Sequence, residues 1–310
     1  MAALLFAAAP TAVRGQASVA DIRWLPVAPL EGSVFSVLVT PARGLVPARG
    51  TLSGEPLHFA PAAPGVFRAF GAVPIGARDS VALQIHLEDS SLGLVQGAIA
   101  WIPVARRRVP VERIRTDPRF ARAPDSALAA RIARERARIR EVQGRTHETP
   151  RLWRERFVRP RASRITSVFG MRRVVNGVPG ARHFGTDLDG NTGDPVRAAN
   201  RGVIALVGDF FYGGCLVYVD HGAGLLTGYL HLSRILVSEG DTVAPGELIG
   251  HVGATGRVTG PHLHWLANYG RVSVDPLGLT ELDPGVPAER LSAQAARGTR
   301  GTRSGPACRP

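Results

Sequence analysis

The sequence predicts a mainly β protein: an immunoglobulin-like β-sandwich at the N-terminus, a basic helical connector, and a curved antiparallel β domain with a groove at the C-terminus. Three observations lead to this prediction. Short runs of alternating apolar and polar residues recur on both sides of the chain's middle, which is strand periodicity. Glycine and proline, 36 and 24 of the 310 residues, separate these runs. Only one long stretch has helical spacing, and no second helix is expected.

The N-terminal domain is predicted to span residues 18–105. In the stretch 81–88, four aliphatic residues alternate with Ala, Gln, His and Glu, as in a half-buried strand. Loops of Pro, Gly and Ala separate this run from similar ones, which favours a small sandwich. His58 and His86 have no ligand partner nearby in the sequence, so both are predicted to be surface or edge residues.

The two ends of the chain are expected to lie outside the folded domains. Residues 1–17 begin with an apolar run that is too short to span a membrane. They end in Gly15-Gln16-Ala17, a small-x-small pattern that predicts a signal peptide cleaved after Ala17. The protein is therefore expected to be secreted, into the periplasm or cell envelope. Residues 282–310 have no periodicity and are predicted to be disordered.

Positive charge is concentrated in the predicted connector, residues 106–154, and just beyond it. The net charge is +13, the chain has no lysine, and 21 arginines against seven acidic residues lie in the range 106–173. A helix is predicted over 126–143, with Asp125 or Ser126 as its N-cap and Gly144 at its end. A solvated connector is the favoured interpretation; binding to an anionic wall polymer or membrane surface is the alternative. Nucleic acid is not expected, because no recognition motif accompanies the charge.

Four residues of the C-terminal half suggest a metal or proton-transfer site. In an extended strand, His262 and His264 project from the same side because side chains alternate faces. His183 and Asp187 stand four apart, but the glycine and threonine between them are poor helix residues, so an extended or bulged segment is expected. A hydrolytic zinc site needs three protein ligands and one open position, and imidazoles with a carboxylate meet that need.

A third segment, Thr227-Gly228-Tyr229-Leu230-His231, adds another histidine. Strict alternation predicts that Thr227, Tyr229 and His231 share one strand face. If this strand neighbours the other two segments in one sheet, its histidine joins theirs along a single groove. Tyr229 is then a candidate either for stabilising an oxyanion or for packing.

These three segments carry a resemblance to a known family. His183-Phe184-Gly185-Thr186-Asp187, Tyr229-Leu230-His231-Leu232 and His262-Leu263-His264 resemble the motifs of lysostaphin-type (LytM-like) zinc endopeptidases, which cut peptide cross-links in bacterial peptidoglycan. The similarity runs over about a third of the chain, within a domain predicted at 155–281.

The resemblance implies a role for each of these side chains and a substrate. It implies that His183, Asp187 and His264 bind Zn²⁺, that His231 and His262 are catalytic, and that the partner is a peptidoglycan peptide. Which of the two catalytic histidines is the general base stays open. The loops 172–180 and 209–214 are expected to set the width of the groove and the choice of bond, and the sequence does not indicate an oligomeric state.

Three other functions compete with a zinc endopeptidase. A non-heme iron oxygenase also uses two histidines and a carboxylate, but usually as His-x-Asp or His-x-Glu, whereas the spacing here is His-x-x-x-Asp. The segment 238–250 resembles the hairpin of biotinyl and lipoyl domains, yet a chain without lysine cannot carry either cofactor on lysine. Some LytM-like proteins have lost zinc ligands and activate cell-wall amidases instead; here every ligand position is filled.

Overall fold

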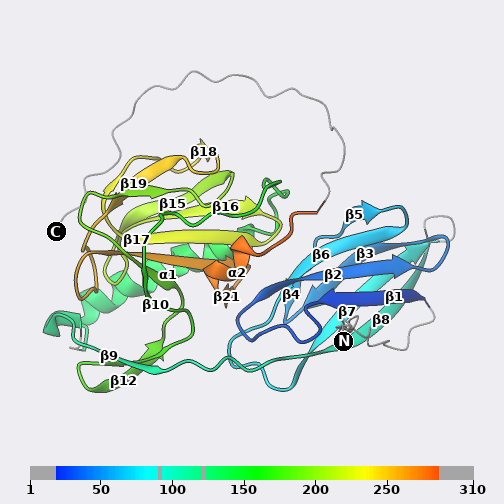
Figure 1. Ribbon diagram of the computed structural model, residues 1–310, viewed down its shortest axis with the longest axis horizontal. Coiled ribbons are helices and arrows are strands. Elements are labelled where there is room, and N and C mark those ends of the chain that lie inside the picture. Colours follow the sequence, from blue (N-terminus) through cyan, green and yellow to red (C-terminus); the bar gives the residue numbers. More distant parts are fainter. Residues whose placement is uncertain (1–18, 90–92, 121–122, 286–310) are drawn as a thin grey trace, which may run out of the picture.

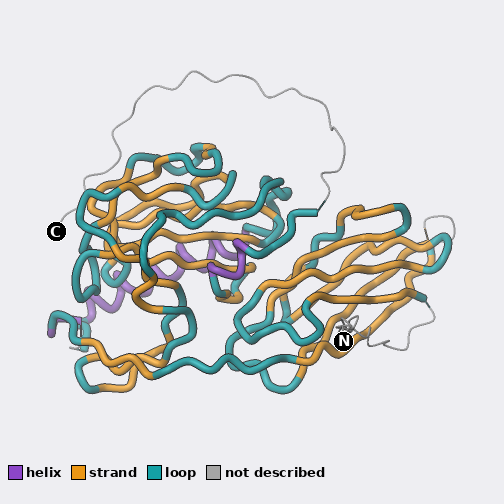
Figure 2. Tube along the Cα trace, viewed as in Figure 1, coloured by secondary structure: helices purple, strands orange, loops and turns teal. Residues whose placement is uncertain are grey.

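The computed structural model describes residues 19–89, 93–120 and 123–285 of the chain (Figure 1). The predicted signal peptide and most of the predicted tail lie outside these residues. The fold is mainly β, as the sequence predicts, with two β domains side by side, and strands make up about half of the described chain (Figure 2). Among the described residues, no helix has both the length and the apolar character needed to cross a membrane.

The N-terminal domain consists of two four-stranded sheets, with strand orders β1-β2-β6-β5 and β4-β3-β7-β8. Their facing sides share one apolar core, to which β2 gives Phe35 and Val37 and β7 gives Leu83 and Ile85, all at most 1% exposed. The alternation in the sequence therefore does place one strand face inside. The immunoglobulin-like topology stays a prediction. The strands are β1 (Ala20–Leu25), β2 (Val34–Pro41), β3 (Leu45–Leu52), β4 (Glu55–Pro56), β5 (Ala60–Ala63), β6 (Val66–Ala72), β7 (Ser80–Asp89) and β8 (Leu94–Pro103).

The connector contains more regular structure than the predicted helix. It begins with a strand, continues through a short 3-10 helix, and then forms the long helix, whose N-cap Asp125 accepts a hydrogen bond from the Leu128 backbone N–H at 2.8 Å. Ile139 and Val142 pack on an apolar cluster on the outer face of the C-terminal sheet, so the helix docks by one edge. These elements are β9 (Val111–Ile114), η1 (Pro118–Phe120) and α1 (Ser126–Arg145).

The C-terminal domain is built on a ten-stranded sheet, whose main order is β10-β13-β20-β17-β16-β15-β18 and whose strand pairings are antiparallel. A second, three-stranded sheet has the order β12-β11-β9, so the connector strand belongs to it. The strands are β10 (Ile165–Ser167), β11 (Arg172–Val175), β12 (Val178–Arg182), β13 (Thr186–Asp189), β14 (Pro195–Arg197), β15 (Gly202–Phe210), β16 (Gly214–Gly222), β17 (Leu225–Ile235), β18 (Thr242–Val243), β19 (Leu248–Val252), β20 (His262–Tyr269) and β21 (Val272–Val274).

Two sequence predictions need correction. A second helix does exist: α2 (Pro276–Thr280) begins after Asp275, whose side chain accepts from the Leu277 backbone N–H. His58 is not a surface residue without a partner, because its Nε2 lies 2.8 Å from Nδ1 of His147. This contact belongs to the junction between the domains, where the Phe70 and Trp153 rings also pack with centroids 5.2 Å apart.

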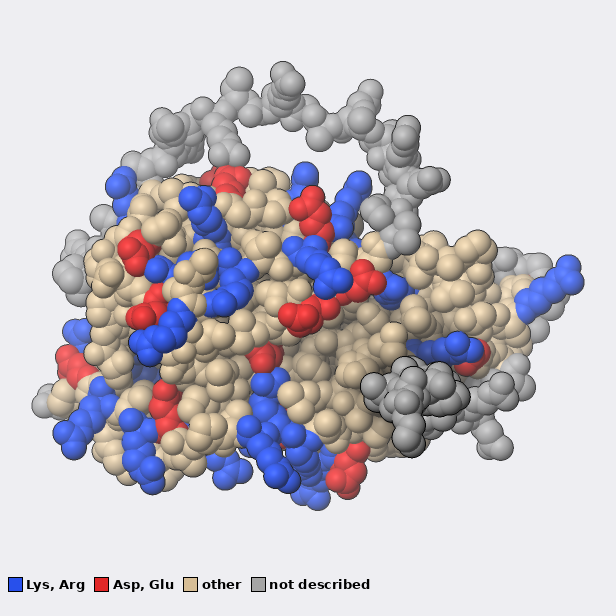
Figure 3. Space-filling model, viewed as in Figure 1, with Lys and Arg blue, Asp and Glu red and all other residues tan. Residues whose placement is uncertain are grey.

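Several arginines of the connector and of the segment just beyond it are paired within the molecule. Arg107 contacts Asp275 at 2.8 Å, Arg138 contacts Glu239 at 2.9 Å, and Arg161 contacts Asp194 at 2.8 Å. On the face shown in Figure 3, basic and acidic side chains are interspersed and do not form separate fields. This arrangement agrees with a connector bound to its own domains; binding of wall polymer or membrane stays a prediction.

Candidate active site

The antiparallel pairing of β13 with β20 brings the carboxylate and the two neighbouring histidines together. Asp187 stands directly opposite His264, and Asp189 opposite His262, so alternation places Asp187, Asp189 and both histidines on the same face of the sheet. His183 precedes β13 and is held by backbone hydrogen bonds, one from its N–H to Met171 O at 2.8 Å. A Cβ on Gly185 would lie 2.5 Å from His264 Nε2; only glycine fits this close approach.

Three electron-pair donors converge at this point. Asp187 Oδ1 lies 2.7 Å from His264 Nδ1 and 3.0 Å from His183 Nε2, and those two nitrogens are 3.0 Å apart. In a tetrahedral zinc site, ligand atoms about 2.0–2.2 Å from the ion lie about 3.3 Å from one another, so a shift of a few tenths of an ångström would open room for one. Within the described residues, this is the single cluster of three or more such side chains.

Burial and hydrogen bonding put two of these donors, His264 and Asp187, in the protonation states that a cation needs. Burial lowers the pKa of His264 to about 4, against the opposing effect of Asp187. Burial alone would raise the pKa of Asp187, but hydrogen bonds with His183 and His264 outweigh it and hold that pKa well below its usual value. A neutral imidazole and an ionised carboxylate are the metal-binding forms of these groups.

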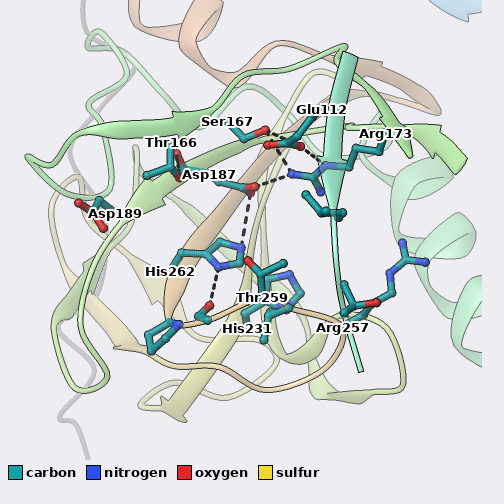
Figure 4. Close-up of a pocket in the computed structure, with 15 residues that line it drawn as sticks. Glu112, Thr166, Ser167, Arg173, Asp187, Asp189, His231, Arg257, Thr259 and His262 are labelled. Carbon is teal, nitrogen blue, oxygen red and sulfur yellow. Dashed lines mark hydrogen bonds and ion pairs between the residues drawn. The ribbon is translucent and has the colours of Figure 1, made fainter. Parts of the chain in front are cut away.

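His262 and His231 lie beside this cluster with one ring nitrogen each available. His262 Nδ1–H donates to Gly260 O at 2.8 Å, and His231 Nδ1–H donates to Thr255 O at 2.8 Å. Each Nε2 is then the unprotonated nitrogen, since a neutral imidazole carries one proton. His262 Nε2 is 3.7 Å from Asp187 Oδ1, and the His231 and His262 rings are 5.1 Å apart, as Figure 4 illustrates.

Strand alternation does not predict the backbone conformation that places the His231 side chain at this site. In the sheet, Tyr229 stands opposite Trp265 and Leu230 opposite His264. Tyr229 is therefore on the core face, so regular alternation would bury His231 there as well. Instead, His231 has a left-handed backbone with φ of 65°, an uncommon conformation outside glycine. The prediction that Tyr229 and His231 share a face is wrong.

Tyr229 has a structural role. It is fully buried, and its hydroxyl accepts hydrogen bonds from the Ala199 backbone N–H at 2.7 Å and from Thr227 Oγ1 at 3.0 Å. His221 is likewise buried, contacts Thr227 Oγ1 at 2.8 Å, and has its pKa lowered to about 4 by burial. Neither belongs to the cluster.

The cluster opens into two adjoining hollows that share part of their lining. Ile114, Arg173, His231 and Arg257 line both of them. One also receives His262 and Asp187, and Figure 4 shows their side chains turned into it. The other is lined by residues of both segments, 172–180 and 209–214, that the sequence indicates as walls of the groove.

Sequence reasoning missed three polar residues at this site, which are Glu112, Ser167 and Arg173. Arg173 Nη2 donates to Asp187 Oδ2 at 2.7 Å, and its Nε donates to Glu112 Oε2 at 2.6 Å. Ser167 Oγ lies 3.1 Å from His183 Nδ1. Nothing in the local pattern distinguishes Arg173 from the neighbouring arginines, and Glu112 lies far from the motifs in the sequence.

Comparison with known proteins agrees with this geometry. Residues 181–276 match the sequence profile of peptidase family M23. These residues form an M23 domain. The resemblance to lysostaphin-type enzymes is thereby confirmed. A crystal structure from Pseudomonas aeruginosa, assigned to peptidase M23, superposes on 81% of this chain and 95% of its own, with a TM-score of 0.62 and 26% identity.

Sequence relatives of the M23 domain are named as peptidoglycan enzymes. The peptidoglycan DD-endopeptidase ShyA of Vibrio cholerae is 46% identical over 105 residues, 33% of this chain and 24% of ShyA. The DD-carboxypeptidase/endopeptidase Mpg of Neisseria meningitidis is 38% identical over 135 residues, 44% of this chain and 31% of Mpg. The chain thus matches about a quarter to a third of the length of these curated relatives.

Proposed function

We propose that the protein is a zinc-dependent endopeptidase that hydrolyses peptide bonds in the cross-bridges or stem peptides of peptidoglycan. The observation that supports this most is the convergence of His183 Nε2, Asp187 Oδ1 and His264 Nδ1 within 3.0 Å of one another. The residues fit zinc by the chemistry of their donors, which are two imidazole nitrogens and one carboxylate oxygen. The M23 relatives named as peptidoglycan endopeptidases support the substrate class.

In this proposal, each side chain of the site has a defined task. Zinc held by the three donors would supply Lewis-acid polarisation of the scissile carbonyl and would make a water molecule acidic near neutral pH. His231 and His262 present unprotonated Nε2 atoms beside the donors. One of them accepts the proton of the attacking water and returns it to the leaving amine, and the other stabilises the developing charge. Burial first, then the neighbouring His264 and His262, hold the pKa of His231 well below its usual value, which keeps it neutral.

The proposal also places the protein outside the cytoplasm, in the periplasm or cell envelope, because its substrate lies there. The signal peptide predicted at 1–17 supports this placement. A fusion of residues 1–17 to a reporter enzyme that is active only after export would test it: reporter activity supports export, and activity equal to that of a leaderless reporter contradicts it.

Digestion of purified sacculi tests the activity. The full chain should release peptide fragments whose mass identifies the bond cut, a chelator should stop release, and added zinc should restore it. His264→Ala, which removes one of three ligands, should lose both bound metal and release. His251→Ala is the matched control, since His251 lies on β19 outside the cluster and its Nδ1 bonds to Gly193 O. A protein that binds zinc, releases nothing, and instead stimulates a cell-wall amidase would replace the proposal with the regulator function.

A further inference from the structure

Two side chains, Arg173 and Ser167, link the connector strand β9 to the cluster of three proposed metal ligands, His183, Asp187 and His264. β9 pairs with β11 in parallel, with Glu112 opposite Arg173. Figure 4 shows Glu112, Ser167, Arg173 and Asp187 turned toward one another, with the first three on one side of the Asp187 carboxylate. Only Asp187 among these four belongs to the stretch 181–276 that matches family M23. The residues that support the ligands thus lie outside the stretch that matches family M23.

One branch of these contacts orients the carboxylate. Glu112 Oε2 accepts from Arg173 Nε at 2.6 Å, and Arg173 Nη2 donates to Asp187 Oδ2 at 2.7 Å. Because Oδ2 is occupied by the guanidinium, Oδ1 is the oxygen that faces His183 and His264. Arginine suits this task, since its planar fork fixes the direction of both bonds.

A second branch orients His183. Ser167 Oγ lies 3.2 Å from Glu112 Oε2, 3.2 Å from Arg173 Nη2 and 3.1 Å from His183 Nδ1. A hydroxyl has one proton, which goes to the carboxylate of Glu112, so Ser167 accepts from Arg173 and from His183 Nδ1–H. His183 Nδ1–H is also 3.1 Å from Val168 O. Its Nε2 is then left with the lone pair that a metal requires.

The negative charge of Glu112 decides how Arg173 affects a bound cation. A guanidinium beside a divalent cation repels it, and the repulsion is poorly screened where side chains are mostly buried. The Arg173 and Glu112 side chains are each 20% exposed and that of Asp187 is 8% exposed. With Glu112 in place, the Arg173 charge is compensated and the arginine serves only to aim Asp187. Without Glu112, an uncompensated positive charge would stand next to the cation.

We propose that Glu112 of the connector, acting through Arg173 on Asp187 and through Ser167 on His183, is a positioning residue that sets the metal affinity of the site. This inference rests on the metal site of the proposed function, but not on which bond is cut. The metal centre would then depend on the connector strand β9 as well as on the stretch that matches family M23, and a shortened chain without β9 would bind metal less tightly.

The test measures zinc affinity of the full chain by competition with a chromophoric chelator, in the absence of substrate. Loss of a residue that supports metal ligands typically lowers affinity about 10–100-fold. We expect Glu112→Gln to weaken zinc binding about tenfold. Glu141→Gln is the matched control, since Glu141 is an exposed residue of α1 whose carboxylate, among the described residues, pairs with Arg145 alone, at 4.0 Å; the zinc affinity of this variant should equal that of the wild type.

Two further variants guard against a folding artefact. In Glu112→Gln/Arg173→Gln the uncompensated charge is gone, so zinc affinity should recover partly relative to Glu112→Gln; a general folding defect would give a further loss. Ser167→Ala removes the branch to His183 alone and should weaken binding a few-fold. Zinc affinity of Glu112→Gln within twofold of the wild type, with unchanged thermal unfolding of the metal-free protein, would overturn the inference. If the wild type binds zinc but releases no sacculus fragments, the proposed function fails while the inference stands.

Discussion

The two β domains differ in how many polar and charged side chains they bury. Among the described residues of the N-terminal sandwich, Glu31 is the one fully buried polar or charged side chain, whereas the C-terminal domain buries His183, Asp187, His231, Asp220 and several others. Burial of a polar group costs about 1–3 kcal/mol unless it is hydrogen-bonded. These four side chains are hydrogen-bonded, and three of them, His183, Asp187 and His231, lie together at the candidate site, whereas the described part of the sandwich buries Glu31 alone.

The single buried acid in the described part of the sandwich, Glu31, contacts the connector. Glu31 accepts hydrogen bonds from the backbone N–H groups of Gly76 at 2.6 Å and Arg107 at 2.9 Å. Arg107 in turn pairs with Asp275 of the C-terminal domain at 2.8 Å. Glu31 therefore holds the start of the connector against both domains. The same connector contains Glu112, which contacts Arg173 beside the proposed metal ligands.

The largest expected effect on the C-terminal domain is a loss of turnover without a loss of bound zinc. His262 contacts no other protein group through Nε2 within hydrogen-bond distance among the described residues, so His262→Ala should leave the zinc donors intact. Turnover on sacculi should fall about 10²–10⁴-fold, the usual contribution of general acid–base catalysis, while the bound zinc stays at the wild-type level. Loss of zinc together with turnover would mean that His262 is a ligand, and unchanged turnover would remove it from the mechanism.

A core substitution in the N-terminal sandwich should instead lower stability and leave zinc affinity unchanged. Leu83 is fully buried in the N-terminal core, and Leu→Ala changes at such sites cost about 2–5 kcal/mol. Leu83→Ala should lower the urea midpoint of the N-terminal transition accordingly, with zinc affinity under native conditions within twofold of the wild type. A tenfold loss of zinc affinity from this distant cavity would show that the two domains are not separable as support and site.

Tyr229→Phe tests whether a buried polar group in the C-terminal sheet is always functional. Removing the hydroxyl leaves the Ala199 N–H without its acceptor, which should cost about 1–3 kcal/mol in the free energy of unfolding. Turnover should stay within about threefold, because the hydroxyl points into the core. Tyr269→Phe is the control: its hydroxyl donates to Pro56 O at 2.6 Å, and Pro56 is exposed, so water can replace it. A large loss of turnover with Tyr229→Phe would instead favour the oxyanion role.

The fold class and the shared strand face of His262 and His264 could be predicted because they follow from local periodicity, whereas the ligand set was implied only by the family resemblance. The two-residue repeat of a strand put His262 and His264 on one face, and the pairing of β13 with β20 set Asp187 opposite His264. His231 could not be placed in this way, because one left-handed residue changes the direction of its side chain. The Asp-Pro pair at 275–276 is a helix-start signal, but α2 is too short to show periodicity.

Glu112 and Arg173 could not be found from the sequence for a different reason. They lie 61 positions apart and meet across a parallel strand pair, and no local pattern encodes the partner of a strand so distant. The many arginines in this region also make Arg173 hard to recognise, because an arginine that orients a carboxylate looks the same in sequence as one that faces solvent.

The smallest expected effect concerns the junction that joins the two domains. His147 Nε2–H donates to Glu55 Oε2 at 2.9 Å, and His58 Nε2–H donates to His147 Nδ1 at 2.8 Å. In this relay, Glu55 must be ionised to accept the hydrogen bond from His147, and a neutral His58 avoids placing a second charge in the buried junction. Burial, and then the proximity of His147, lower the pKa of His58 below 6.5. For Glu55, burial acts to raise the pKa, but the hydrogen bonds from His147 and the Arg271 backbone N–H outweigh it, so the pKa lies below 4.5.

Both shifts have the same sign for stability. A group whose pKa is lower in the folded protein stabilises it fully above the unfolded pKa, and this contribution is lost as pH falls through the folded value. The junction should therefore weaken below pH 6.5, where His58 titrates, and further below pH 4.5, where Glu55 titrates. In metal-free protein, His58→Gln keeps a donor to His147 but does not titrate. Its melting temperature should fall less than that of the wild type between pH 7.5 and 5.5, by about 1–2 °C. Parallel curves for the two proteins would mean that the relay does not hold the sandwich to the M23 domain.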